Sequence, residues 1–147
     1  MSTTPVRTGT AFRVFSIAAL MVCSISTVLA ADWPVFKPGL WTFERIMSGT
    51  GSTPDRASNT RCSDPTAEQK ARQVMLAAPG CKVTPLTQSG KTYRYSATCK
   101  SGAMTTKSES VLEVESAEAY TIRVDSRTDG RKTYDELNAR RVGDCAK

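Results

Sequence analysis

The cysteines are the feature of this sequence that most limits its fold. Four of the five lie in the last two-thirds of the chain, at Cys62, Cys81, Cys99 and Cys145. There is no histidine and no C-x-x-C pair, and the smallest spacing among the four is 18 residues, unlike a zinc site or a thiol redox centre. An even number of dispersed cysteines in a small exported domain indicates two disulfides. We predict no metal site and no cofactor.

The fifth cysteine, Cys23, lies in a segment with the composition of an export signal. Two arginines are the only charges before residue 32, an apolar run spans residues 14–29, and the small residue Ala30 follows it. The run is shorter than the ~20 apolar residues that a membrane-spanning helix needs. We therefore predict a cleavable signal peptide over residues 1–30 and a single β-rich domain over residues 31–147. The mature protein is then periplasmic or secreted from a bacterium, and not an integral membrane protein.

The charge of the mature domain is mildly positive. Without the two arginines of the signal, the domain has 18 Lys and Arg residues and 14 Asp and Glu residues, which gives a formal charge of +4. The basic residues are spread along the chain, whereas nucleic-acid binding usually shows a basic stripe with interleaved aromatics. We expect no nucleic-acid partner.

Alternating apolar and polar residues predict strands along most of the mature chain. Residues 40–47 carry apolar side chains on one face, which Arg45 interrupts. Residues 81–85 and 92–99 form a predicted hairpin, residues 103–115 a long polar strand, and residues 120–127 and 132–142 a second hairpin. Asp129-Gly130 is a strong turn signal between the last two strands. A short strand is also predicted over residues 57–62.

One helix is predicted, from Asp64 to the Pro79-Gly80 pair. Asp64 suits the N-cap and Pro65 the first helical position. An apolar stripe at helical spacing, with Met75 beside it, is expected to pack over the sheet. Its members are Ala67, Ala71, Val74 and Ala78.

The predicted strands, the single helix and the cysteines together give the fold class. It is mainly β with one short helix: an antiparallel meander, cross-linked by disulfides, that forms a small barrel-like or strongly curved sheet.

The pairing of the cysteines stays open at this point. If the hairpin loop has an odd number of residues centred on Gly90, Cys81 and Cys99 lie opposite each other, and Cys62 then pairs with Cys145. The rival set joins Cys62 to Cys81 across the helix and Cys99 to Cys145. We prefer the first set slightly, because a helix that carries the chain back across the sheet puts its two pairs at opposite ends.

Several segments together resemble one family of exported bacterial proteins, the domain-of-unknown-function family 3617. These segments are Pro38-Gly39-Leu40-Trp41, Cys62-Ser63-Asp64-Pro65-Thr66, Cys81-Lys82-Val83, Ala97-Thr98-Cys99-Lys100 and Arg141-Val142-Gly143-Asp144-Cys145. The family usually has an acidic residue where this chain has Thr42. The resemblance covers nearly all of the mature chain and implies the compartment and the cysteine framework. It implies no activity, cofactor or catalytic residue.

Two kinds of function remain for a domain of this description. The first is a non-catalytic domain that binds a small or amphipathic ligand, or an envelope component. Trp41, Phe43, Tyr93 and Tyr95 are its candidate lining residues, and core packing is the alternative for each. The second is a protein–protein interaction module, such as an envelope assembly factor or an inhibitor of a secreted protein.

An enzyme is the third and least favoured class. Without histidine, the chain lacks the commonest general base and the usual partner of a serine or cysteine nucleophile. A histidine-independent hydrolase would need paired carboxylates, and the carboxylates that adjoin here, such as Asp135 and Glu136, read more simply as solvated strand surface. We assign no catalytic residue.

Overall fold

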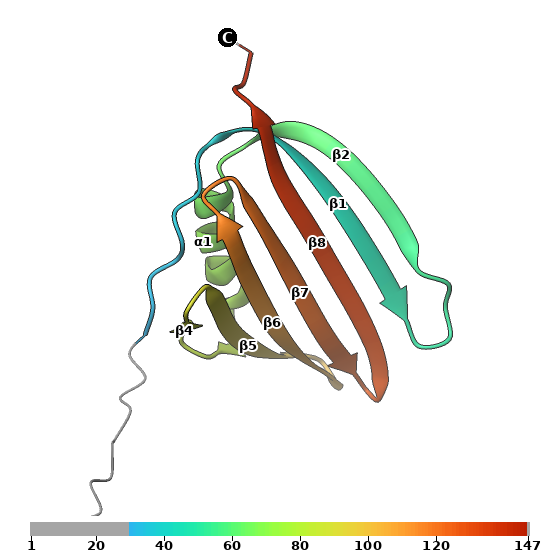
Figure 1. The fold of residues 1–147 in the computed structure, drawn as a ribbon. Helices are drawn as coiled ribbons and strands as arrows, with labels where there is room; N and C mark the ends of the chain where they lie inside the picture. The colour runs from blue at the N-terminus through green and yellow to red at the C-terminus, as the bar shows by residue number, and fades with distance from the viewer. Residues whose placement is uncertain (1–29, 147) are drawn as a thin grey trace, which may run out of the picture.

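The computed structural model describes residues 30–146, in which a helix lies on one face of a curved β-sheet (Figure 1). The elements in chain order are β1 (Gly39–Gly49), β2 (Asp55–Ser63), α1 (Pro65–Leu76), β3 (Cys81–Val83), β4 (Thr87–Ser89), β5 (Thr92–Ser101), β6 (Met104–Ser116), β7 (Ala119–Thr128) and β8 (Arg131–Gly143). Apart from Ala30, the predicted export signal lies outside the described residues.

The strands form one eight-stranded antiparallel sheet in the order β2-β1-β8-β7-β6-β5-β3, with β4 also paired to β5. The last strand, β8, returns beside the first, β1, over ten paired positions from Leu40 to Gly49. The prediction of a mainly β, antiparallel, disulfide-linked domain is confirmed. Within the described residues the sheet does not close into a barrel, because β2 and β3 remain as its edges.

One face of the sheet, here called the inner face, carries the hydrophobic core. Residues directly opposite each other on paired strands point to the same side, so the register gathers Phe43, Ala139 and Tyr120 on this face, and Trp41, two residues before Phe43, points the same way. Trp41 is fully buried, and its ring lies 5.6 Å from that of Tyr120. The other members of the core cluster are Phe36, Leu112 and Ile122. The predicted inward face of residues 120–124 is confirmed.

The opposite, outer face is polar. Arg123 on β7 binds Glu136 on β8, with Nε 3.0 Å from Oε2, and Glu113 on β6, with Nη1 3.1 Å from Oε1. Thr121 donates to Asn138 on the same face at 2.8 Å. These side chains are in part exposed to water, so the ion pairs among them add little to stability.

The orientation of α1 differs from the prediction. Its N-terminus is as expected, since the Asp64 side chain accepts from the backbone N–H of Ala67 at 3.2 Å. However, the buried helical residues are Pro65 and Gln69, whereas Val74 and Met75 are 74% and 69% exposed. The apolar stripe therefore faces away from the sheet, and the side that faces the sheet is polar.

Hydrogen bonds explain why the polar side of α1 faces inward. Gln73 accepts from the indole Nε1 of Trp33 at 2.8 Å, and Thr66 accepts from the backbone N–H of Phe36 at 2.8 Å. The segment at residues 31–38, which runs along α1 to the start of β1 (Figure 1), thus provides partners that the apolar stripe could not use. The stripe cannot satisfy donors, so it is left to solvent.

The two disulfides join Cys62 to Cys145 and Cys81 to Cys99, which is the set preferred from the sequence. The turn that places the second pair differs from the expectation. It has two residues, Gly90-Lys91, between β4 and β5. A break after Val83 shifts the register by one and brings Cys81 opposite Cys99.

Pro85 lies in that break, between β3 and β4, and not in a strand as predicted. Because proline has no N–H, it cannot contribute a donor to the ladder, and the strand ends before it. The turn between β7 and β8 is as predicted: Asp129 and Gly130 have φ of 47° and 86°, the pair of positive values that a type I′ hairpin requires.

Candidate functional site

A cavity of about 300 Å³ opens on the inner face, between α1 and the half of the sheet that contains β1 and β2. Four apolar side chains form its floor: Phe43, Ile122, Val124 and Leu137. Register explains their meeting, because Ile122 on β7 lies opposite Leu137 on β8, which in turn lies opposite position 45 on β1. Phe43 and Ile122 are buried, whereas Val124 and Leu137 are partly exposed to the cavity. We call this cavity the inner pocket.

Three guanidinium groups surround the apolar floor, from Arg45 on β1, Arg61 on β2 and Arg72 on α1. Arg45 forms two hydrogen bonds to Asp135, one of them from Nε to Oδ1 at 2.8 Å. These bonds raise the pKa of the Arg45 guanidinium above its ordinary value. Arg45 and Asp135 are diagonal neighbours on adjacent strands, which places their charges within reach on the inner face.

Arg61 is held in the same way by Glu68 on α1. Its Nη1 and Nη2 donate to the two carboxylate oxygens at 2.6 and 2.9 Å, and Ser63 also donates to Glu68 at 2.7 Å. The hydrogen bond from Arg61 lowers the pKa of Glu68, and the hydrogen bond from Ser63 adds to this effect. The guanidinium carbon lies 4.5 Å from the ring centre of Phe43, so Arg61 stacks on the pocket floor while it pairs.

Arg72 differs from the other two. Among the described residues no carboxylate lies within 4.0 Å of its guanidinium. Its side chain is only partly exposed. The inner pocket therefore combines an apolar floor with two neutralised arginines and one arginine whose charge has no ion-pair partner in residues 30–146.

The four aromatic residues proposed from the sequence occupy different places. Trp41 lies in the solid core, and its indole Nε1 donates to the Lys37 carbonyl at 3.1 Å. Phe43 lines the inner pocket. Tyr93 packs half-buried against the core from β5, and Tyr95 lies with its ring 5.7 Å from that of Trp33. Strands β8, β7 and β6 separate β5 from β1, so the two pairs do not share one pocket lining.

The pocket arginines were not singled out by sequence reasoning as site residues. One signal was present, because Arg45 interrupts an otherwise apolar strand face. A charged residue at such a position indicates either an ion-pair partner or a gap in the hydrophobic core. In the structure Arg45 pairs with Asp135 and also borders the inner pocket. No local pattern marks Arg61 or Arg72, since their place in the pocket depends on how β2 and α1 pack.

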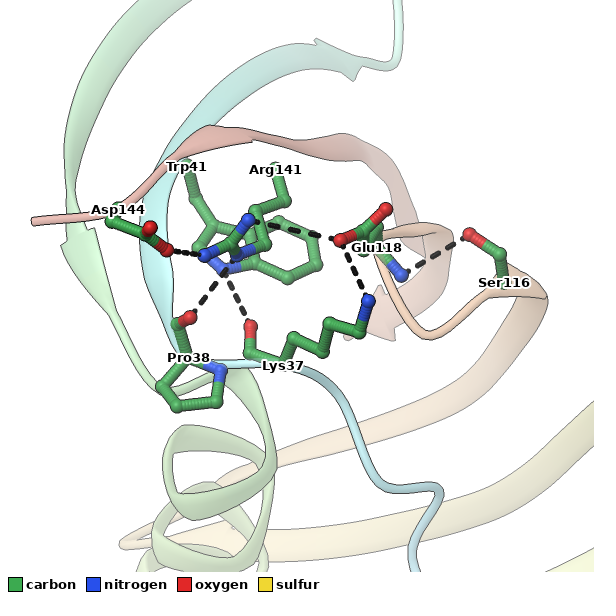
Figure 2. A network of polar contacts seen from close by, with 7 residues as sticks. All are labelled: Lys37, Pro38, Trp41, Ser116, Glu118, Arg141 and Asp144. Atoms are coloured by element: carbon green, nitrogen blue, oxygen red, sulfur yellow. Dashed lines mark hydrogen bonds and ion pairs between the residues drawn. The ribbon is translucent and has the colours of Figure 1, made fainter.

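A second polar cluster lies at the end of the sheet where β8 terminates, and Figure 2 shows its contacts. Arg141 Nε donates to the Pro38 carbonyl at 3.1 Å, Nη1 lies 3.7 Å from Glu118, and Nη2 pairs with Asp144. Lys37 also binds Glu118, at 3.1 Å. Arg141 is mostly buried and has a partner in each direction, so this cluster joins the start of the domain to its end.

The part of the chain that the structure describes contains no group of three or more His, Cys, Asp or Glu residues that could hold a metal ion. None of its helices is long and apolar enough to cross a membrane.

The protein is thus a disulfide-linked domain built on an open antiparallel sheet, with an arginine-rimmed pocket on the inner face of that sheet. Residues 36–145 match the family model described as "Protein of unknown function (DUF3617)". The chain belongs to this family, as its segments indicated. Comparisons with curated proteins and with solved structures found no match.

Proposed function

We propose that this protein is an exported, non-catalytic domain that binds a small amphipathic ligand in the inner pocket. The observation that carries the proposal is the apolar floor of Ile122, Val124 and Leu137 within a ring of guanidinium groups. Small-molecule sites are typically concave and mostly apolar, with a few placed polar groups, and have volumes from about 300 Å³ upward. The inner pocket is concave and has an apolar floor, with a polar rim that is larger than is typical, and a volume at the lower end of this range favours a slender ligand.

The pocket favours this function over the protein-interaction module. Val124 and Leu137 remain partly exposed inside a concavity, where a flat partner surface would not reach them. Covering them with an alkyl chain removes apolar surface from water at roughly 25 cal/mol per Å². The paired arginines around them are already held in place, so little side-chain freedom is lost on binding.

The test is direct binding of simple amphiphiles to the mature protein. Sodium decanoate and 1-decanol, below the concentrations at which they aggregate, are titrated calorimetrically into wild-type protein and into Val124→Trp. We expect at least one probe to bind the wild type, and Val124→Trp to weaken that binding at least tenfold by filling the pocket. Met104→Trp, on a side chain 54% exposed outside the pocket, is the matched control and should bind as the wild type does.

Failure of both probes to bind, or equal binding by Val124→Trp, would rule out the inner pocket as the site. Native mass spectrometry of protein isolated from its own cells provides a second arm. A bound small molecule that is lost in Val124→Trp supports the proposal, and protein that is consistently free of small molecules contradicts it.

The compartment belongs to the same proposal. Two disulfides are consistent with an oxidising environment outside the cytoplasm. The charge and apolar pattern of residues 1–30 supports export with cleavage after Ala30. N-terminal sequencing of protein from the periplasm or medium should begin at Ala31. Protein that remains in the cytoplasm with four free thiols would contradict export.

A further inference from the structure

Resting on the proposed function, we propose that the ligand of the inner pocket carries a single negative charge, on an oxyanion such as a carboxylate, and that Arg72 binds it. The proposal depends on the charge balance of the pocket and on the position of Arg72 at the border of its apolar floor.

The charge balance leaves one positive charge. Arg45 is neutralised by Asp135 through two hydrogen bonds, and Arg61 is neutralised by Glu68 in the same bidentate way. The fold already holds a carboxylate against each of these two guanidinium groups in bidentate geometry, so an incoming anion would have to replace an equivalent partner there. Arg72 is the third guanidinium of the lining, and no described carboxylate pairs with it.

Glu68 does not serve both Arg61 and Arg72. Each of its carboxylate oxygens already accepts from Arg61, and one of them also accepts from Ser63. Arg72, one helical turn further along α1, acts on Glu68 only as a nearby charge, and this is the smallest of the effects on the pKa of Glu68. Within residues 30–146 no carboxylate pairs with Arg72, so the five donors of its guanidinium can be directed to a ligand.

The position of Arg72 favours an amphiphile over a small inorganic ion. Arg72 lies on the α1 side of the pocket, and the floor across from it consists of side chains from β7 and β8. A ligand with its charged head at Arg72 can extend an apolar tail over Ile122, Val124 and Leu137. An inorganic anion would pair with Arg72 but leave these side chains exposed, so it would bind more weakly than an anion that carries an alkyl chain.

The size of the expected effect follows from the energy of charged hydrogen bonds. A partly buried hydrogen bond to a charged group contributes roughly ten- to hundredfold to an equilibrium constant. We therefore expect sodium decanoate to bind at least tenfold more tightly than 1-decanol, and decyltrimethylammonium to bind most weakly. Added NaCl should weaken decanoate and leave decanol nearly unchanged, because salt screens only the charged contact.

The test uses the mature protein, the three decyl probes and sodium decyl sulfate at pH 8, with calorimetry as the readout. Arg72→Gln should lower decanoate affinity to that of decanol while decanol affinity stays within twofold of wild type. Arg56→Gln is the matched control, because Arg56 is an exposed arginine of β2 that has no ion-pair partner in residues 30–146 and does not line the pocket. Thermal unfolding of each variant verifies that it folds.

The outcomes separate this inference from the proposed function. If decanoate and decanol bind wild type equally, or if Arg72→Gln keeps the preference for decanoate, the inference that Arg72 binds an anionic head group is wrong. The proposal that the inner pocket binds an amphiphile is not affected by either result. If no probe binds, the proposed function fails and this inference with it. Decyl sulfate that binds as well as decanoate supports any monoanionic oxyanion, and decyl sulfate that binds like decanol restricts the head group to a carboxylate.

Discussion

At Gly39 the backbone of the first strand passes so close to the last strand that no side chain fits. A Cβ built at this position would lie 2.5 Å from the carbonyl oxygen of Gly143 and 2.6 Å from Nε of Arg141. The residue also has a φ of +151°, which L side chains rarely adopt. This contact brings the start and the end of the domain together beside the Cys62–Cys145 disulfide.

We therefore expect Gly39→Ala to lower the free energy of unfolding by about 2–3 kcal/mol, from strain and steric overlap together. Urea unfolding followed by tryptophan fluorescence measures the change. Gly143→Ala is the control, since nothing lies within 4 Å of a Cβ at that position, and its effect should stay within about 0.5 kcal/mol. Equal destabilisation by both variants would show that the close approach is not the cause.

A second prediction at this scale concerns acid. A carboxyl whose pKa is lower in the folded than in the unfolded chain stabilises the fold above its unfolded pKa, and this stabilisation is lost as the pH falls through the folded pKa. The hydrogen bond from Arg61 lowers the pKa of Glu68 from its ordinary 4.5. The gain at pH 7 is on the order of 1 kcal/mol or less, because both side chains are partly exposed.

The stability difference between wild type and Glu68→Gln should therefore be present at pH 7 and shrink as the pH falls below about 4.5. Urea unfolding of both proteins between pH 7 and pH 2.5 measures it. A difference that stays constant over this range would show that the carboxylate charge of Glu68 does not contribute.

At the scale of elements, α1 is unusual because its polar side faces the sheet. Gln69 is 4% exposed, whereas Val74 is 74% exposed. Residues 65, 69, 72, 73 and 76 share the inward side at helical spacing, and the apolar stripe lies opposite to it. The helix is joined to the rest of the domain by hydrogen bonds, by the buried Pro65 and by a disulfide close to each end.

Two substitutions test this orientation. Val74→Lys should change the free energy of unfolding by no more than about 0.5 kcal/mol, because the side chain already faces water. Gln69→Lys should destabilise by about 2 kcal/mol or more, because it buries a charge without a partner. Thermal or urea unfolding measures both. If Val74→Lys were the more damaging change, α1 would pack with its apolar stripe on the sheet.

For the molecule as a whole, the two disulfides act at opposite ends of the sheet. Cys62 and Cys145 join the end of β2 to the residues after β8, across 83 positions of sequence. Cys81 and Cys99 join β3 to β5 across 18 positions. On either side of α1 the chain is thus fixed to the sheet, so the wall of the inner pocket that carries Arg72 is held at both ends.

The disulfide that closes the longer loop should contribute more to stability than the one that closes the shorter loop. Replacing Cys62 and Cys145 by serine should lower the free energy of unfolding by about 4–5 kcal/mol, and replacing Cys81 and Cys99 by about 3 kcal/mol, since the longer loop restricts the unfolded chain more. Urea unfolding of the two double variants measures the difference. The reverse order would mean that native contacts of the hairpin disulfide outweigh chain entropy.

Local patterns were sufficient for most of the secondary structure. Period-two alternation predicted the strands, the Asp64-Pro65 start predicted α1, and Asp129-Gly130 predicted the type I′ turn, because each depends on residues close together in the chain. The break at Pro85 was missed, although proline has a local reason to end a strand. The preferred disulfide set followed from strand direction, and the structure contains it.

What the sequence determined by itself was the compositional outline of the domain: antiparallel strands, one helix, four dispersed cysteines and the family. Only the tertiary structure decided which side of α1 meets the sheet, because the partners of Gln73 and Thr66 come from residues 33–36, far away in sequence. It also decided the inner pocket, since Arg45, Arg61 and Arg72 belong to three elements that meet only through strand register and helix packing. Residues that line the same pocket in the folded protein can therefore be far apart in the sequence and follow no common sequence pattern.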